Sequence, residues 1–272
     1  MKTKMTALLA VAGALTLAAL SMPAAARSVE KIVDYRIGEA DYRGYVYYDD
    51  AVKQPLPLVV MVPNWLGTNA DNREQAREIA ARDYVVFVAD MYGRDRQPAD
   101  AAAAGQAVRA LYGDRPELRR RAKAAKDEAV RYAGEARIAD TSKVAVIGFC
   151  FGGGTALELA RTGEPLAATV SFHGNLAIAP PERNLKFRTR ILALHGDADP
   201  YVPADQIDPF LVEMRSSGVD WELVRFGGAV HSFTDKKANQ PGQSMYDAKA
   251  ARRAFALMHD FLAEAFAAGV PG

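Results

Sequence analysis

A cysteine framed by glycines lies near the middle of the chain, in Gly148-Phe149-Cys150-Phe151-Gly152. A short apolar, β-branched run over 144–147 precedes it, and residues 155–160 have the composition of a helix. The pattern is typical of a strand-to-helix turn that holds a nucleophile in a strained conformation, with glycine on both sides to avoid collisions. A helix N-terminus also favours a thiolate over a thiol. The pattern therefore predicts that Cys150 is a nucleophile.

Two other interpretations of this stretch have to be weighed. A lone cysteine is often no more than a small buried hydrophobic residue. Glycine-rich turns between a strand and a helix also bind phosphates. The dinucleotide pattern would require glycine at position 150, and the phosphate loop would require G-K-S/T, so the sequence fits neither of them.

Two later loops offer partners for a nucleophile. The loop 195–203, HGDADPYVP, contains the carboxylates Asp197 and Asp199, and the loop 227–233, GGAVHSF, contains His231. The chain order nucleophile, acid, base is that of the α/β-hydrolase triad. In such a triad the histidine takes the thiol proton or forms an ion pair with the thiolate, and the acid fixes its tautomer.

The elements that must position these residues follow from hydrophobic periodicity. We expect helices at 71–82, at 99–136 with a break near Gly113 and Pro116, and at 155–160, 205–216 and 247–267. We expect strands at 29–37, 41–48, 58–62, 84–89, 144–147, 167–171, 191–194 and 221–226, the first two forming an antiparallel hairpin at a sheet edge.

Strands that are apolar throughout and alternate with helices predict an α/β fold, with a mostly parallel central sheet and helices on both faces. Sites in such sheets form beyond the carboxyl ends of the strands. Four loops should meet there, at 63–67, 148–152, 195–203 and 227–234.

The first 26 residues have the pattern of a secretory signal peptide. Lys2 and Lys4 precede a long apolar run, which small residues up to Ala26 follow. The competing interpretation is an uncleaved membrane anchor, but Gly13 and Pro23 favour cleavage near Ala26. We therefore expect an exported protein, periplasmic or secreted, with a single α/β domain over 27–272.

Charge and cysteine content exclude several classes of protein. The formal net charge is +1 and becomes −1 without Lys2 and Lys4, so nucleic acid and stable membrane association after cleavage are not expected. The single cysteine excludes zinc clusters and Cys-x-x-Cys redox sites. One unpaired thiol in an exported protein favours a chemical role for it.

The motifs GFCFGG, HGDADPYVP and HSF together resemble the dienelactone hydrolase family of α/β-hydrolases, over essentially all of the mature chain. The resemblance implies a triad of Cys150, Asp199 and His231. It also implies an oxyanion hole made by the backbone N–H groups of Trp65 and Phe151, with no metal and no organic cofactor. Asp197 is the alternative acid, and its other possible role is to stabilise the loop by an Asx turn.

Two positions depart from the founding members of that family. Asn64 stands where they carry a glutamate that helps to activate the thiol, and an amide cannot accept the proton. Activation of Cys150 then falls to His231 and the helix dipole. Asp235 stands where their pattern has an arginine, which argues against muconate-type anionic lactones.

The remaining candidates concern the substrate pocket. Asn64, Tyr92, His173 and Tyr246 are the candidate pocket residues, and Trp65 and Phe151 could add aromatic walls. His173 has an alternative role as a hydrogen-bonded structural histidine. His195 is expected to order the acid loop, and His259 to have a surface or core role in the last helix.

These features predict an exported thiol hydrolase of small esters or lactones that works through an acyl-Cys150 intermediate. We expect a monomer or a small homo-oligomer whose partner is a small-molecule substrate. Two alternatives stay open: a non-catalytic binding protein on the same fold, and a redox-responsive thiol protein. A papain-like peptidase is disfavoured, because its cysteine lies near the mature N-terminus without a glycine frame.

Overall fold

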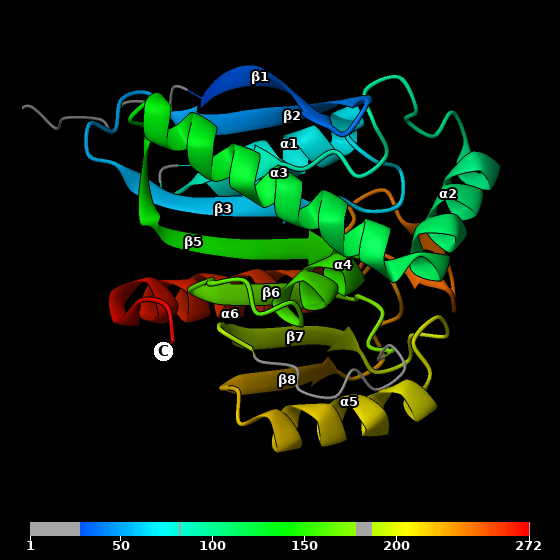
Figure 1. The fold of residues 1–272 in the computed structure, drawn as a ribbon. Coiled ribbons are helices and arrows are strands. Elements are labelled where there is room, and N and C mark those ends of the chain that lie inside the picture. The colour runs from blue at the N-terminus through cyan, green and yellow to red at the C-terminus, as the bar shows by residue number, and fades with distance from the viewer. Residues whose placement is uncertain (1–27, 82, 178–186, 272) are drawn as a thin grey trace, which may run out of the picture.

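An eight-stranded sheet forms the centre of the computed structural model, which describes residues 28–81, 83–177 and 187–271 (Figure 1). The strand order is β1-β2-β4-β3-β5-β6-β7-β8, and β9 and β10 form a separate ribbon. The strands are β1 (Ser28–Ile37), β2 (Ala40–Asp49), β3 (Leu56–Val62), β4 (Val85–Val88), β5 (Ala139–Phe149), β6 (Ala168–Phe172), β7 (Arg190–Gly196), β8 (Trp221–Phe226), β9 (Asn239–Gln240) and β10 (Ser244–Met245).

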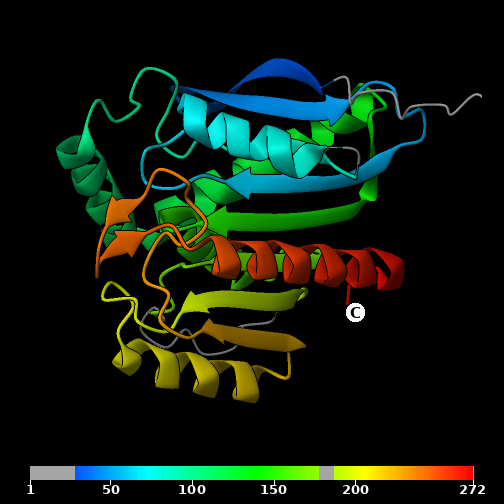
Figure 2. The same cartoon turned by 180° about the vertical axis from the view of Figure 1, so that it is seen from behind.

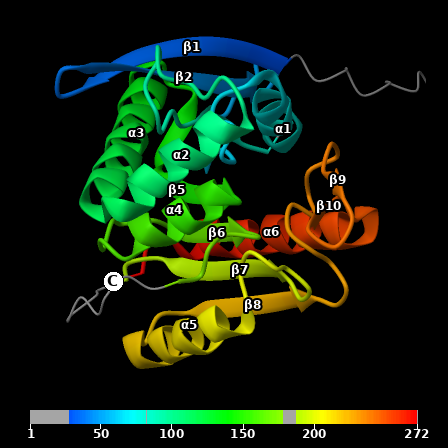
Figure 3. The same cartoon turned by 90° about the vertical axis from the view of Figure 1, so that its right-hand side faces the viewer.

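The sheet is mostly parallel, as the apolar strands predict. β1 and β2 form an antiparallel hairpin at one edge, and β2 pairs antiparallel with β4. From β4 to β8 every pairing is parallel. Parallel strands bring their carboxyl ends to one edge, and Figure 3 looks onto that end of the sheet.

Helices cover both faces of the sheet. α1 and α6 lie on one face, which Figure 2 shows from the front, and α3, α4 and α5 lie on the other (Figure 1). The bounds are α1 (Ala70–Ala80), α2 (Ala101–Gly113), α3 (Arg115–Glu135), α4 (Phe151–Ala160), α5 (Ala204–Ser217) and α6 (Ala248–Ala268). Within the described ranges, no helix has the length and apolar character needed to cross a membrane.

The structure differs from the sequence prediction at a few boundaries. α4 begins at Phe151, four residues before the predicted start, so the glycines that follow Cys150 are helical. Because glycine has a poor helix propensity, the sequence pattern does not predict a helix over these residues. Burial against the sheet stabilises the helix there. The ribbon β9–β10 was not predicted, because strands of two residues have no periodicity. The predicted signal peptide lies outside the described residues.

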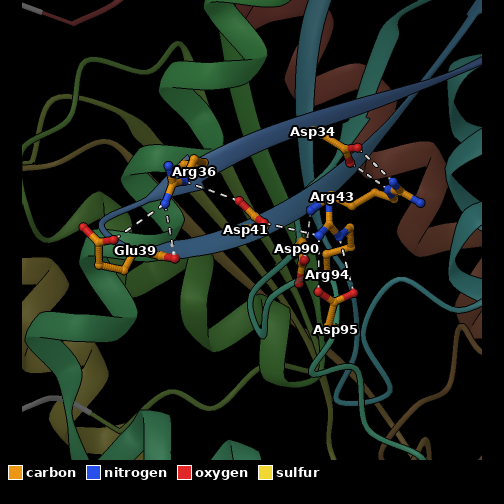
Figure 4. Close-up of polar contacts among 8 residues, drawn as sticks. All are labelled: Asp34, Arg36, Glu39, Asp41, Arg43, Asp90, Arg94 and Asp95. Carbon is orange, nitrogen blue, oxygen red and sulfur yellow. Dashed lines mark hydrogen bonds and ion pairs between the residues drawn. The ribbon is translucent and has the colours of Figure 1, made fainter.

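A cluster of charged residues holds the loop after β4 against the β1–β2 hairpin (Figure 4). Asp34 and Arg43 form a cross-strand ion pair at 2.7 Å, and Arg94 pairs with Asp41 at 3.2 Å. The buried carboxylate of Asp90 accepts the backbone N–H of Arg43 at 3.0 Å. Its other oxygen accepts the N–H groups of residues 92 and 93, so the hairpin fixes the position of the loop that follows β4.

A buried ionic network fixes α4 between α3 and α5. The Glu158 carboxylate of α4, whose side chain is 2% exposed, contacts three guanidinium groups, those of Arg115, Arg119 and Arg161. Arg161 in turn binds Glu213 of α5 at 2.7 Å. Because α4 carries the predicted nucleophile at its start, the network positions that helix.

Replacing Glu158 by alanine should reduce the free energy of unfolding by about 3–5 kcal/mol, because it leaves buried guanidinium charges without their shared carboxylate. Denaturant unfolding measures the effect. The matched control is Glu135→Ala in α3, which breaks an ion pair with Arg131 at a side chain that is 66% exposed. The control should lose no more than about 1 kcal/mol. Equal losses in both variants would contradict this account of the network.

Candidate active site

The turn between β5 and α4 is strained in the way that its glycines indicate. Cys150 has φ 54° and ψ −118°, a conformation that L residues rarely adopt. A Cβ on Gly148 would lie 2.0 Å from the carbonyl oxygen of Gly152, and a Cβ on Gly152 would lie 2.1 Å from that of Val62. Only glycine at both positions allows this close approach, which brings Cys150 to the start of α4.

His231 and Asp199 meet at the same end of the sheet. The imidazole Nδ1 lies 2.7 Å from Asp199 Oδ2, and the Asp199 side chain is fully buried. The second carboxylate oxygen accepts the backbone N–H of Tyr201 at 2.8 Å. A carboxylate on Nδ1 leaves Nε2 for the other side of the ring, and Cys150 and His231 line the same cavity close to each other.

The environment of His231 favours its protonated form. Burial opposes a charge on the imidazole, but the neighbouring Cys150 and the hydrogen bond to the Asp199 carboxylate outweigh it. Together they raise the pKa of His231 to about 10. A buried carboxylate thus holds the protonated form of the His231 ring beside Cys150.

The other carboxylate of the acid loop points elsewhere. Asp197 pairs with Arg225 of β8 at 2.5 Å, and its side chain is 44% exposed. An Asx-type hydrogen bond does stabilise this loop, but the residue that makes it is Asp199, whose carboxylate accepts the N–H of Tyr201. Of the two carboxylates, the structure therefore brings Asp199 to the histidine.

Asn64 shapes the loop that carries Trp65. Its side-chain oxygen accepts the backbone N–H of Leu66 at 3.0 Å and the Asn72 amide at 2.8 Å. Its backbone carbonyl accepts the N–H of Gly67 at 3.1 Å. Asn64 therefore closes the turn in which Trp65 lies, and its side-chain oxygen is already used by two donors.

Tyr92 joins the Trp65 loop to the start of α4. Its hydroxyl donates to the backbone carbonyl of Trp65 at 2.9 Å, and its ring stacks on Phe151 with centroids 5.9 Å apart. Phe151 is the first residue of α4, so its N–H has no acceptor within the helix. Tyr92 lies behind the two predicted oxyanion-hole residues and is not among the residues that line the cavity.

A cavity of about 1020 Å³ opens at this end of the sheet. Cys150 and His231 line it, as do the predicted site residues Asn64, Trp65, Phe151, His173 and Tyr246. Arg109 of α2 and Arg252 of α6 also line it, and neither makes an ion pair with a carboxylate in the described part of the chain. Sequence reasoning missed both, because an arginine on a helix face has no motif that separates it from a solvated charge.

The other two histidines lie outside the cavity. His195 is buried, its Nδ1 has no partner among the described residues, and burial lowers the pKa of His195 against the opposing charge of Asp199. His259 of α6 stacks on Tyr84 and lies 3.1 Å from its hydroxyl. No group of three or more His, Cys, Asp or Glu side chains within residues 28–81, 83–177 and 187–271 is arranged to hold a metal ion.

A mostly parallel sheet with a strained Gly-x-Cys-x-Gly turn, an aspartate loop and a histidine loop at the carboxyl end of its strands is the arrangement of an α/β-hydrolase. The chain belongs to the dienelactone hydrolase family, whose model matches residues 42–266. It is a hydrolase of the ester-hydrolase type, and the fold, family and class of enzyme predicted from its motifs are confirmed.

Named relatives and solved structures agree with the family. A dienelactone hydrolase-like promiscuous phosphotriesterase from metagenomic libraries superposes with a TM-score of 0.81 and 39% identity, covering 87% of this chain and 98% of its own. A putative carboxymethylenebutenolidase of Yersinia pestis is 24% identical over 84% of this chain and 85% of its own length. A probable 2-oxo-3-(5-oxofuran-2-ylidene)propanoate lactonase of Bradyrhizobium is 28% identical, and the match covers 65% of this chain and 73% of the lactonase.

The charge on His231 should make stability depend on pH. Its folded pKa of about 10 lies above the ordinary 6.5, so its stabilising contribution is complete below pH 6.5 and is lost as pH rises through about 10. Unfolding in urea at about pH 6 and about pH 9 measures the loss. In His231→Gln the difference between the two pH values should be smaller. An unchanged difference would show that His231 is not protonated in the fold.

Proposed function

We propose that the protein hydrolyses small esters or lactones through an acyl-Cys150 intermediate, with His231 as base and Asp199 as the acid that orients it. The observation that carries the proposal is the contact of His231 with both Asp199 and Cys150 at the wall of one cavity. Within the family this arrangement gives a thiol the means to act as a nucleophile at neutral pH.

The proposed reaction proceeds in two halves. The Cys150 thiolate attacks the ester carbonyl, and the backbone N–H groups of Trp65 and Phe151 stabilise the oxyanion. The C–O bond to the alcohol breaks, the leaving oxygen takes the proton from His231, and a thioester forms. Water then attacks the thioester as His231 takes its proton. Cys150 leaves as a thiolate, the acid product is released, and the ion pair is restored.

Asn64 has a supporting part in this proposal. Because two donors already use its side-chain oxygen, it acts by holding the turn that presents the Trp65 N–H. Activation of the thiol is assigned to His231 and to the N-terminus of α4. Asn64 therefore replaces a proton-accepting residue with one that orders the oxyanion loop.

The cavity is large enough for substrates beyond the smallest esters and lactones. Its volume of about 1020 Å³ lies at the upper end of small-molecule sites, which are roughly 300–1,000 Å³. The aromatic side chains of Tyr112, Tyr246 and Phe255 line it. Asp235 adds a carboxylate to the wall, which opposes an anionic group near it, while Arg109 and Arg252 add positive charge elsewhere on the lining.

The likeness to the promiscuous phosphotriesterase favours a second activity. That protein shares 39% of its residues with this chain over 98% of its own length. We propose that aryl phosphotriesters are a secondary substrate class for the same thiol. An aryl phosphotriester therefore belongs in the substrate panel, beside short acyl esters and lactones.

Replacing Cys150 by alanine should abolish turnover of a short aryl ester, with a loss of at least about 10⁴-fold in kcat, because no other nucleophile is assigned. Mass spectrometry of the intact wild type, quenched during turnover, should show the added mass of one acyl group, and peptide mapping should assign it to the peptide that contains Cys150. The variant should show no adduct while keeping its fold, which circular dichroism measures.

Ser171→Ala is the matched control. Ser171 is buried on β6, the strand next to β5, and does not line the cavity, so its loss should leave kcat unchanged. Retained turnover in Cys150→Ala would refute the catalytic thiol. A wild type inactive on esters, thioesters, lactones and phosphotriesters would instead favour a binding protein. Activity lost only after mild peroxide would indicate redox regulation of the same thiol.

We also propose that residues 1–26 direct export and are removed, leaving a mature chain that begins near Arg27. Expressed at full length in a bacterial host, the protein should appear in the periplasmic fraction with an intact mass that lacks these residues. A control lacking residues 1–26 should stay in the cytoplasm. Full-length protein in the membrane fraction would instead indicate an uncleaved anchor.

A further inference from the structure

His173 connects the nucleophile turn to the base loop. It follows β6, is 2% exposed, and its two ring nitrogens have partners on different loops. Nδ1 lies 3.1 Å from the backbone N of Cys150, an N–H that also contacts the carbonyl of Phe172 at 3.0 Å. Nε2 lies 2.8 Å from the hydroxyl of Thr234, three residues beyond His231.

The partners of His173 determine its tautomer. A backbone N–H can only donate, so Nδ1 must be the unprotonated acceptor for Cys150, and the ring proton must lie on Nε2. Nε2–H then donates to the Thr234 hydroxyl. A protonated ring would place a second N–H against the N–H of Cys150, so the bridge requires a neutral imidazole.

The surroundings keep His173 neutral. Burial, and then the charge of His231, lower the pKa of His173 well below its ordinary value. The ring lies edge-on to the His231 ring, with centroids 5.2 Å apart, and edge-on to Phe233 at the same separation. A neutral ring can therefore pack against the protonated His231 without repulsion between two cations.

Backbone strain is concentrated where this bridge acts. Among the described residues, five that are not glycine have positive φ, and three of these lie at the site: Cys150 at 54°, His173 at 38° and Ser232 at 54°. Such conformations cost about 1–3 kcal/mol each and persist only where surrounding contacts impose them. The hydrogen bonds of His173 link the loops that contain all three.

We propose that His173 is a positioning residue: its imidazole fixes the Cys150 turn relative to the loop that carries His231, through Thr234. The inference rests on the proposed function of Cys150 and His231 and assigns no contact between His173 and the reacting atoms. Without the bridge, the sulfur and the His231 ring lose their fixed separation, and the thiolate loses part of its stabilisation by the imidazolium.

Thr234→Val removes the acceptor while keeping the shape of the side chain. We expect kcat for a short aryl ester to fall about 10-fold with little change in KM, because one hydrogen bond that orients the catalytic pair is lost. The pH midpoint of Cys150 alkylation by iodoacetamide should rise by about half a unit or more. Thr234→Ser keeps a hydroxyl and should restore both values.

His173→Phe removes both hydrogen bonds and keeps a ring of similar size. It should reduce kcat about 100-fold, since misplacement of catalytic groups by about 1 Å has effects of that order. The alkylation midpoint should move at least as far as in Thr234→Val. If His173→Phe does not fold, the valine and serine variants of Thr234 still decide the question.

Thr169→Val is the matched control for Thr234→Val. Thr169 is a buried threonine at the opposite end of β6, where it shares a hydrogen bond with Thr189. It should lose stability without any shift in the alkylation midpoint. The same result in Thr234→Val, lower stability with an unshifted midpoint, would overturn the proposal, because a purely structural histidine would behave in that way.

Failure of the proposed function gives a different result. If wild-type turnover does not depend on Cys150, the measurements on the wild type and on Cys150→Ala show it before any Thr234 variant is compared. If turnover depends on Cys150 while Thr234→Val matches Thr169→Val in kcat and in alkylation midpoint, only the role of His173 is refuted.

Discussion

The close approach of backbone atoms around Cys150 is the constraint on which the site depends. Gly148 and Gly152 pass so near to neighbouring carbonyl groups that a Cβ at either position would overlap them. This approach lets β5 turn into α4 within one residue and leaves Cys150 with a positive φ at the helix start. The parallel sheet, the buried Glu158 network and the helices on both faces hold that turn in place.

The two histidines of the site, His231 and His173, differ in charge because their neighbours differ. His231 lies between a buried carboxylate and the Cys150 sulfur, and both favour its charged form. His173 is as deeply buried but faces a backbone N–H and a hydroxyl, so its neutral form is favoured. The same residue type thus gains opposite properties from its neighbours, and a charged ring packs against an uncharged one.

Much of the fold could be predicted because its strands are apolar throughout and its helices have clear periodicity. The boundaries of β1, β2, β8 and α6 were predicted to within a residue or so. The start of α4 could not be predicted, because three successive glycines disfavour an isolated helix. Burial against the sheet stabilises the helix at these glycines. The β9–β10 ribbon is a local pairing with only two residues in each strand, which is too short to show a hydrophobic period.

The sequence by itself determined the chemical groups, their order along the chain and the family. A cysteine between glycines, an aspartate before Pro-Tyr-Val-Pro and a histidine after the last strand are local patterns, which a one-dimensional chain can display. The motif resemblance also favoured Asp199 over Asp197, and the structure places Asp199 at His231. Only the tertiary structure decided that Tyr92 lies behind the cavity wall and that His173 links two loops. These relations depend on distances between residues far apart in the chain, and packing alone fixes such distances.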